Sequence, residues 1–229
     1  MSDAPDTVVP PDVVAFDVNE TLSDMAPMAD RFADVGAEPA LAKLWFASLL
    51  RDGFALGAAG DASPFREIAP EVLRTTLAGC RLDRGLDAAV EHVMDGFAEL
   101  SVHDDVRAGI VALAGLTRIV TLSNGASAVA ERLSERAGLH DHVERFLSVD
   151  DAGAWKPARA PYRYAASACA VDPGQMMLVA VHPWDIHGAR RAGLRTAWVN
   201  RGGDRYPAYF SRPEVEVTSV GQLAALWGA

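Results

Sequence analysis

The stretch VVAFDVNETL, residues 13–22, decides the fold class because its apolar run ends in a carboxylate, Asp17. Continuous apolar runs of this kind are typical of strands buried on both faces of a parallel sheet. Open α/β sheets bind their ligands just beyond the carboxyl ends of such strands. The stretch therefore places Asp17 at a binding edge, where it could attack carbon or phosphorus, or could serve only as the cap of a turn.

Three further segments repeat the order of apolar strand, polar tip and helix. They are RIVTLSN at 118–124, the expected strand at 145–149 with the residues after it, and MLVAVHPWD at 177–185. The tips carry, in chain order, Ser123 with Asn124, Lys156, and Asp185. Each tip alone is more often a turn or a helix N-cap than a catalytic group. Because parallel strands end at one edge of their sheet, the four tips together predict a single site.

The periodicity of the chain divides it into a sheet-forming part and a helical part. Helices are expected at 39–56, 65–77 and 86–100, with a Gly/Ala-rich loop at 57–64 and no convincing strand between about 26 and 100. Further strands are expected at 196–200 and 215–218. This order predicts an α/β fold with a Rossmann-like parallel-sheet core. The core would comprise residues 1–24 and 104–229, and a helical cap would be inserted at 25–103.

Composition limits the partners of the protein. Half of the 229 residues are hydrophobic, which supplies a sizeable core, and the formal net charge of −10 argues against nucleic acids and anionic membranes. Cys80 and Cys169 suggest packed thiols and no disulfide framework. The N-terminus lacks the basic and apolar regions of a signal peptide, and no apolar run is long enough to span a bilayer. We therefore expect a cytoplasmic protein.

The four tips resemble the motifs of the haloacid dehalogenase superfamily. Asp17 with Thr21 resembles the first motif, and Ser123, Lys156 and Asp185 resemble the second, third and fourth. The closest resemblance is to the L-2-haloacid dehalogenases of type II. It rests on Ser123-Asn124, on Lys156-Pro157 with Tyr162 six residues after the lysine, and on Trp184-Asp185.

The resemblance implies catalytic roles for six residues, which are Asp17, Thr21, Ser123, Asn124, Lys156 and Asp185. Asp17 would be the nucleophile, and Lys156 would keep it ionised. Thr21 would fix the nucleophile loop, while Ser123 and Asn124 would help to hold an anion. Asp185 would orient Lys156 or position a hydrolytic water. Ser123 could also be a helix N-cap, and Asp185 could cap a helix that starts near Ile186.

The expected substrate- or halide-binding residues are Val18, Asn19, Phe46, Arg51, Tyr162, His182 and Trp184. Several depart from the type II pattern, in which Tyr stands at Asn19, Arg at Phe46 and Asn at His182. Arg51 is a cation within an apolar helical stretch, so it is either an anion contact or a surface arginine whose stem lies along apolar neighbours. His182 could orient water, act as a base, or be hydrogen-bonded at a strand end.

The first and fourth motifs argue against phosphoryl transfer. Phosphatases of the superfamily carry an acid two residues after the nucleophile, where Asn19 stands and cannot donate a proton as an acid. They also tend to carry an acid at the position of Val181, which helps to hold Mg²⁺. Displacement of a halide needs neither acid, so we expect no metal and no cofactor.

These observations predict a metal-independent hydrolytic dehalogenase of small 2-haloacids, similar to an (S)-2-haloacid dehalogenase, that works through an aspartyl ester. The substrate would be a halogenated carboxylic acid, and a homodimer is an assembly that the resemblance allows. One alternative is a phosphatase of the same superfamily with an atypical first motif. Another is a catalytically silent binding protein on the same fold.

Overall fold

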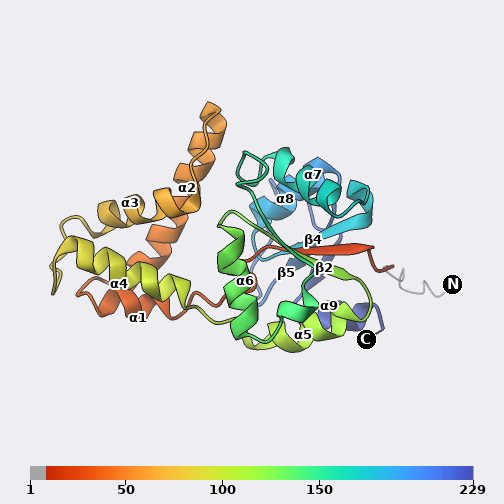
Figure 1. Cartoon of the computed structure of the whole chain (residues 1–229), viewed down its shortest axis with the longest axis horizontal. Coiled ribbons are helices and arrows are strands. Elements are labelled where there is room, and N and C mark those ends of the chain that lie inside the picture. Colours follow the sequence, from red (N-terminus) through yellow and green to blue (C-terminus); the bar gives the residue numbers. More distant parts are fainter. Residues whose placement is uncertain (1–8, 229) are drawn as a thin grey trace.

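The computed structural model describes residues 9–228, which form a six-stranded parallel sheet flanked by helices, with a helical cap beside it (Figure 1). The order of strands is β3-β2-β1-β4-β5-β6. Their bounds are β1 Val13–Phe16, β2 Arg118–Ser123, β3 Arg145–Ser148, β4 Met176–Ala180, β5 Arg195–Val199 and β6 Val215–Val217. The predicted α/β fold is thus confirmed. Residues 1–8, on which the signal-peptide prediction rests, lie outside the described range.

The central strand β1 places Asp17 at the carboxyl edge of the sheet, where the order in which the chain adds strands reverses. All four residues of β1 are buried, and the strand pairs with β2 on one side and β4 on the other. The chain runs from β1 outward to β2 and β3, and then returns to place β4 against the other side of β1. Loops diverge at such a reversal and leave room for a ligand beyond the carboxyl ends of the strands.

Helices cover both faces of the sheet because successive side chains of a strand point to opposite faces. Val14 and Phe16 face a core formed with α5 (Asp104–Ala114), α6 (Ser127–Arg136) and α9 (Val220–Leu226). Val13 and Ala15 face a second core formed with α7 (Arg159–Ala168) and α8 (Pro183–Ala192). Short 3₁₀ helices lie at His140–His142 and Pro173–Gln175. Within residues 9–228 no helix has both the length and the apolar character that crossing a bilayer requires.

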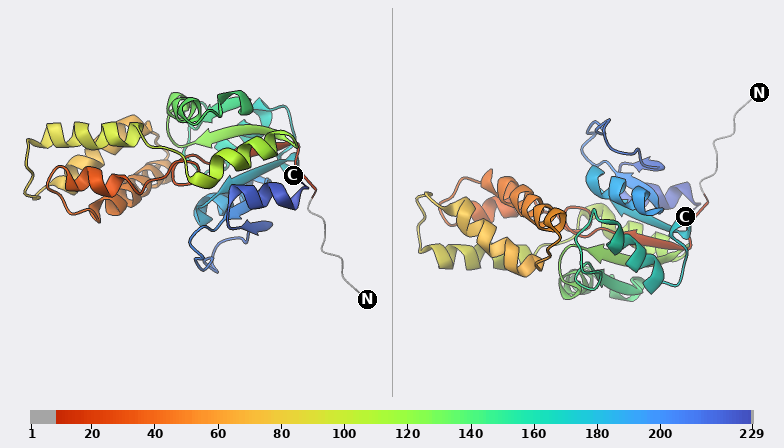
Figure 2. Two further views of the ribbon diagram at one scale, coloured as in Figure 1. Left: turned by 90° about the horizontal axis from the view of Figure 1, so that it is seen from below. Right: turned by 90° about the horizontal axis from the view of Figure 1, so that it is seen from above.

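Four helices form the cap, which lies beyond one end of the sheet (Figure 2). They are α1 Met28–Ala33, α2 Leu41–Ala59, α3 Phe65–Leu77 and α4 Leu86–Ala98. Their apolar faces pack around Trp45, whose indole donates to the Ala69 carbonyl at 3.0 Å. Helix α2 runs past the predicted start of a loop at 57 and ends at Gly60, whose left-handed φ of 88° suits glycine.

The two segments that connect the cap to the sheet run side by side. The Asp24 amide donates to the Ser101 carbonyl at 2.8 Å, and the His103 amide donates to the Leu22 carbonyl at 3.0 Å. The boundaries between core and cap, after residue 24 and before residue 104, stay a prediction.

An indole from the loop after β3 joins the cap to the core. The Trp155 ring lies so close to Gly53 of α2 that a Cβ atom at that glycine would come within 2.5 Å of it. The same ring stacks on Phe65 with centroids 6.2 Å apart, and its N–H donates to the Ser63 carbonyl at 3.0 Å. Since Lys156 is the next residue, the indole also determines where the cap lies relative to the predicted site.

We predict that Gly53→Ala separates the cap from Trp155 and lowers the free energy of unfolding by about 1–3 kcal/mol, the usual cost of overpacking. Gly57→Ala is the matched control, because Gly57 lies one turn further along α2 with open space around its Cα. That variant should be neutral or more stable by up to about 1 kcal/mol, since alanine favours helix. Urea unfolding of both variants measures the effect, and equal stabilities would contradict the proposed contact.

Candidate active site

The buried ammonium of Lys156 is the centre of the site. Its Nζ donates to Asp17 Oδ1 at 2.8 Å, to Asp185 Oδ2 at 2.6 Å and to the Leu122 carbonyl at 2.9 Å. Lys156 and Asp185 are fully buried, and Asp17 is 4% exposed. All three hydrogens of the ammonium thus have an acceptor, and one cation joins two carboxylates from different strand ends.

Hydrogen bonds hold both oxygens of the Asp17 carboxylate. Its Oδ1 accepts from Lys156, while its Oδ2 accepts from the Thr21 hydroxyl at 2.7 Å and lies 3.1 Å from His182 Nδ1. The Thr21 hydroxyl in turn accepts from the Val181 amide at 3.1 Å, which ties the loop after β1 to the end of β4. The carboxylate is therefore held in one orientation.

Asp185 lies inside α8, which begins at Pro183 and has His182 at its N-cap position. The alternative in which Asp185 caps a helix that starts near Ile186 is wrong. Its Oδ1 accepts from the Tyr162 hydroxyl at 2.6 Å, and its Oδ2 accepts from Lys156. The first turn of α8 is placed so that this carboxylate points inward and orients the ammonium.

Burial and the paired charges act in opposite directions on the pKa values of this cluster. Burial by itself raises the pKa of Asp17, but Lys156 and His182 outweigh it and hold the pKa well below its ordinary value. Burial lowers the pKa of Lys156, but the two carboxylates outweigh burial, and the pKa lies above its ordinary value. For Asp185, burial and the neighbouring charge of Asp17 raise the pKa despite Lys156. Of the two carboxyl groups, Asp17 is the one whose neighbours keep it ionised.

His182 is the second cation beside Asp17, and sequence reasoning missed its partner. The ring Nε2 lies 2.7 Å from Glu20 Oε2, and the ring stacks on Trp184 with centroids 5.0 Å apart. Burial lowers the pKa of His182, but hydrogen bonds to Asp17 and Glu20 raise it to about 9. The sequence carried a signal for Glu20, which is an acid three residues after Asp17. The comparison with the family patterns considered only its neighbour Asn19.

Ser123 and Asn124 lie at the tip of β2 without touching Asp17. The Ser123 hydroxyl accepts from the Gly125 amide at 2.9 Å, and α6 begins only at Ser127, so Ser123 is no helix N-cap. Asn124 Oδ1 accepts from the Lys156 backbone amide at 3.0 Å. Its Nδ2 is buried and has no partner among the described residues. Such an unpaired buried donor is costly unless a ligand completes it.

A cavity of about 680 Å³ opens between the cap and the ends of β4 and β5. Phe46 of the cap and His182 of the core both line it, as do Glu20 and Trp198, whereas Asp17 does not. His182 therefore stands between the cavity and Asp17. Trp184 meets the cap through Phe54, with ring centroids 5.0 Å apart, and its ring centroid lies 5.9 Å from Lys156 Nζ.

Four of the expected substrate contacts need correction, and three of them are Val18, Tyr162 and Arg51. The side chain of Val18 packs in the sheet core, because it points inward from the loop. Tyr162 is fully buried behind Asp185 and holds that carboxylate, so it has no surface for a substrate. Arg51 lies on the outer face of α2, since the buried positions Leu49 and Gly53 define the inner face. Its side chain is 69% exposed and bonds Asp52 at 2.8 Å.

Asn19 is also outside the cluster. It is half-buried, pairs with Ser23 in a short bridge, and borders a small hollow with Phe97 and Leu133 at the foot of the cap.

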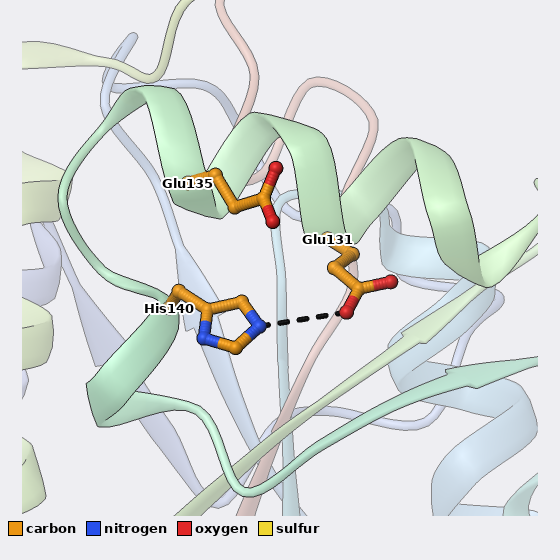
Figure 3. Close-up of side chains that lie close together, drawn as sticks. All are labelled: Glu131, Glu135 and His140. Carbon is orange, nitrogen blue, oxygen red and sulfur yellow. Dashed lines mark hydrogen bonds and ion pairs between the residues drawn. The ribbon is translucent and has the colours of Figure 1, made fainter.

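A separate group of potential metal ligands lies on the outside of the core (Figure 3). Glu131 and Glu135 stand one turn apart on α6, and His140 Nε2 lies 3.4 Å from Glu131 Oε1. All three side chains are exposed, and none contacts the Asp17 cluster. We assign no function to this group.

A parallel sheet whose carboxyl edge holds a buried aspartate and lysine beside a helical cap defines an α/β protein with a Rossmann-like core and a capped site. The chain belongs to the haloacid dehalogenase-like hydrolase family, whose sequence model matches residues 11–193. The predicted resemblance is thus confirmed.

Relatives of two activities are similar over most of the chain. The (S)-2-haloacid dehalogenase of Pseudomonas sp. (strain YL) is 28% identical over 219 residues, which cover 93% of each protein. The plasmid phosphoglycolate phosphatase of Cupriavidus necator is 30% identical over 203 residues, which cover 85% of this chain and 83% of that protein. The crystal structure of the L-2-haloacid dehalogenase RSc1362 matches with a TM-score of 0.89 at 27% identity. The match covers 97% of this chain and 100% of that chain.

We predict that Lys156→Met destabilises the protein by about 3–5 kcal/mol at pH 7, because it leaves two buried carboxylates without their cation. Without Lys156, burial should raise the pKa values of the two carboxyl groups. The difference from wild type should then narrow as the pH falls and the carboxylates take up protons. Guanidinium unfolding between pH 4 and 8 measures this difference.

The matched control is Lys43→Met, which removes the only other lysine of the chain from an exposed position. Its stability should stay within about 0.5 kcal/mol of wild type at every pH. A Lys156→Met variant that behaves like this control would show that the buried cation does not hold the cluster together.

Proposed function

We propose that this protein is a metal-independent hydrolytic dehalogenase of small (S)-2-haloacids. The observation that carries the proposal is the Asp17 carboxylate, which is buried, kept ionised by two cationic neighbours, and held in one orientation. A carboxylate that has lost most of its water and is fixed in place is a competent nucleophile toward carbon. The similarity to the Pseudomonas (S)-2-haloacid dehalogenase supports the same reaction.

The reaction has two halves. In the first, a carboxylate oxygen of Asp17 attacks C2 of the haloacid in line with the leaving halide, which inverts the carbon and forms an aspartyl ester. In the second, water adds to the Asp17 Cγ. The bond then breaks between Cγ and the carboxylate oxygen that had attacked C2, so this oxygen leaves with the product. The products are the 2-hydroxy acid, halide and a proton, and the carboxylate is restored.

The donors around Asp17 favour this reaction over the phosphatase alternative. Mg²⁺ requires several oxygen ligands in octahedral geometry. Both Asp17 oxygens already accept from hydrogen-bond donors, and Asn19 and Val181 stand where phosphatases carry acids. A metal at Asp17 would compete with His182 and Lys156 for these two oxygens. The silent-protein alternative is disfavoured because an idle site would not need a buried, fully paired lysine and its two carboxylates.

Asn124 is the proposed donor to the anionic parts of the substrate. Its Nδ2 is the buried, unpaired donor on the Lys156 side of the site. A haloacid carries a carboxylate, and the departing halogen gains negative charge in the transition state, so a fixed donor stabilises both. With Arg51 outside the site, this amide takes over the anion-binding role expected of the cap arginine.

We expect that Asp17→Asn abolishes halide release while the fold is retained, because an amide is a poor nucleophile. In single-turnover hydrolysis in ¹⁸O-water, the label should enter Asp17 and not the product, since water attacks the Cγ of the ester. Peptide mass spectrometry locates the label. Label that appears in the product in the first turnover would mean direct attack of water on the substrate.

We also expect that chelation with EDTA leaves halide release from 2-chloropropionate unchanged, because the reaction requires no metal. The same samples are assayed for phosphate release from phosphoglycolate and other phosphate esters, with and without Mg²⁺. Turnover of phosphate esters that depends on Mg²⁺, with no release of halide, would support the phosphatase. No turnover of either class would support the binding protein.

The assembly and location of the protein stay predictions. A homodimer and a cytoplasmic location are part of the proposal. Light scattering after size-exclusion chromatography measures the assembly.

A further inference from the structure

His182 lies between the cavity and the proposed nucleophile, Asp17. The residue follows β4 directly, and its ring lies between Asp17 Oδ2, 3.1 Å from Nδ1, and Glu20 Oε2, 2.7 Å from Nε2. Stacking on Trp184 fixes the plane of the ring. The imidazole therefore has one nitrogen directed at the nucleophile and the other at a second carboxylate.

The backbone at Glu20 is bent in a way that brings its carboxylate back toward Asp17. Glu20 has a φ of +62°, which residues with a Cβ atom rarely adopt. The bend is held by two contacts: the Glu20 carbonyl lies 3.0 Å from His103 Nε2, and its amide donates to the Ser23 hydroxyl at 3.3 Å. Unusual backbone of this kind is concentrated at functional sites. The loop thus presents Asp17 and Glu20 to opposite nitrogens of one ring.

The 680 Å³ cavity supplies the space from which water reaches this ring. Glu20 and His182 form part of its wall, and the side chains are 41% and 12% exposed. Asp17 does not line the cavity, and Lys156 approaches it from the opposite side. Water that moves from the cavity toward Asp17 meets His182 first.

We infer that Glu20 positions His182 as the general base that hydrolyses the Asp17 ester. The inference rests on the proposed covalent intermediate and adds Glu20 as a positioning residue for its second half-reaction. Glu20 would hold the Nε2 hydrogen, which leaves Nδ1 to accept a proton beside Cγ. A carboxylate that orients a histidine base in this way also stabilises the imidazolium that forms.

The charge balance explains why the base becomes available only after the first half-reaction. In the resting protein two carboxylates face the ring, both ring nitrogens donate, and the pKa of His182 is raised to about 9. Formation of the ester removes the negative charge of Asp17. The pKa of His182 then falls, and as the halide leaves, the Nδ1 proton passes to a water molecule that enters from the cavity.

Hydrolysis of the ester returns both residues to their resting states. Neutral His182 takes one proton from a water molecule through Nδ1, and the water oxygen bonds to the Asp17 Cγ. The tetrahedral centre collapses as the bond breaks between Cγ and the oxygen that is joined to C2. The departing alkoxide takes the remaining proton of the water, which yields the hydroxy acid. Asp17 is again a carboxylate, and His182 is again an imidazolium.

The test uses the intact protein with chloroacetate as the probe. Glu20→Gln should still release one equivalent of chloride in a burst, because Asp17 and Lys156 are untouched. Turnover after the burst should fall by about 10²- to 10⁴-fold, the usual contribution of a positioned base. Intact-mass spectrometry should show the ester accumulating on Asp17, and His182→Gln should behave in the same way.

Asp24→Asn is the matched control, because Asp24 is another carboxylate in the cavity wall and bonds the Ala26 amide at 2.9 Å. This variant should turn over without accumulating ester. Glu20→Gln that matches it, with normal turnover and no ester, would overturn the inference. A wild-type protein that forms no ester from any haloacid would instead reject the proposed function.

A measurement that needs no turnover tests the pairing itself. The His182 ring signal, identified by its loss in His182→Gln, is titrated by NMR in wild type, Glu20→Gln and Asp24→Asn. The other charged or titratable side chains of the cavity wall, which stay in place in Glu20→Gln, are Asp24, Lys43, His103, Arg201 and Asp204. The pKa of His182 should fall by at least about one pH unit in Glu20→Gln alone. An unchanged value would overturn the inference.

Discussion

The bond of the buried Lys156 ammonium to two carboxylates is the interaction on which the rest of the site depends. A fully buried lysine is tolerated only when its charge is paired and its hydrogens are accepted, and here Asp17, Asp185 and a carbonyl of β2 meet both needs. The three strand ends that bring these groups together must therefore keep their register. Tyr162 adds the second bond to Asp185, so the carboxylate that orients the lysine is itself held.

The pairing shifts the pKa values of the two carboxyl groups in opposite directions. Asp17 has cations on both sides, and its pKa is lowered, whereas burial and repulsion by Asp17 raise the pKa of Asp185. Two carboxyl groups whose environments push their pKa values apart are suited to different tasks. Asp17 thereby suits the role of the proposed nucleophile, and Asp185 holds the lysine. The replacement of an amide by His182 adds a titratable group on the side of the cavity, and Glu20 completes it.

Aromatic contacts hold the cap to this site. Trp155 packs on Gly53 and Phe65, and Trp184 meets Phe54, so two indoles that flank the catalytic cluster also support the cap. Aromatic contacts of this kind bury large areas with defined geometry. Arg51, on the outer face of the same helix, contributes nothing to them.

The sequence by itself determined the fold and the members of the central cluster, because buried parallel strands read as apolar runs and each run ends in a polar tip. Asp17, Lys156 and Asp185 were all found in this way. Only the tertiary structure decided which way side chains point. Arg51 turns outward because helical phase places it opposite Leu49, and Tyr162 is buried behind Asp185. Glu20 reaches His182, 162 residues away, because the loop bends through a positive φ, which no pattern of residue types reveals.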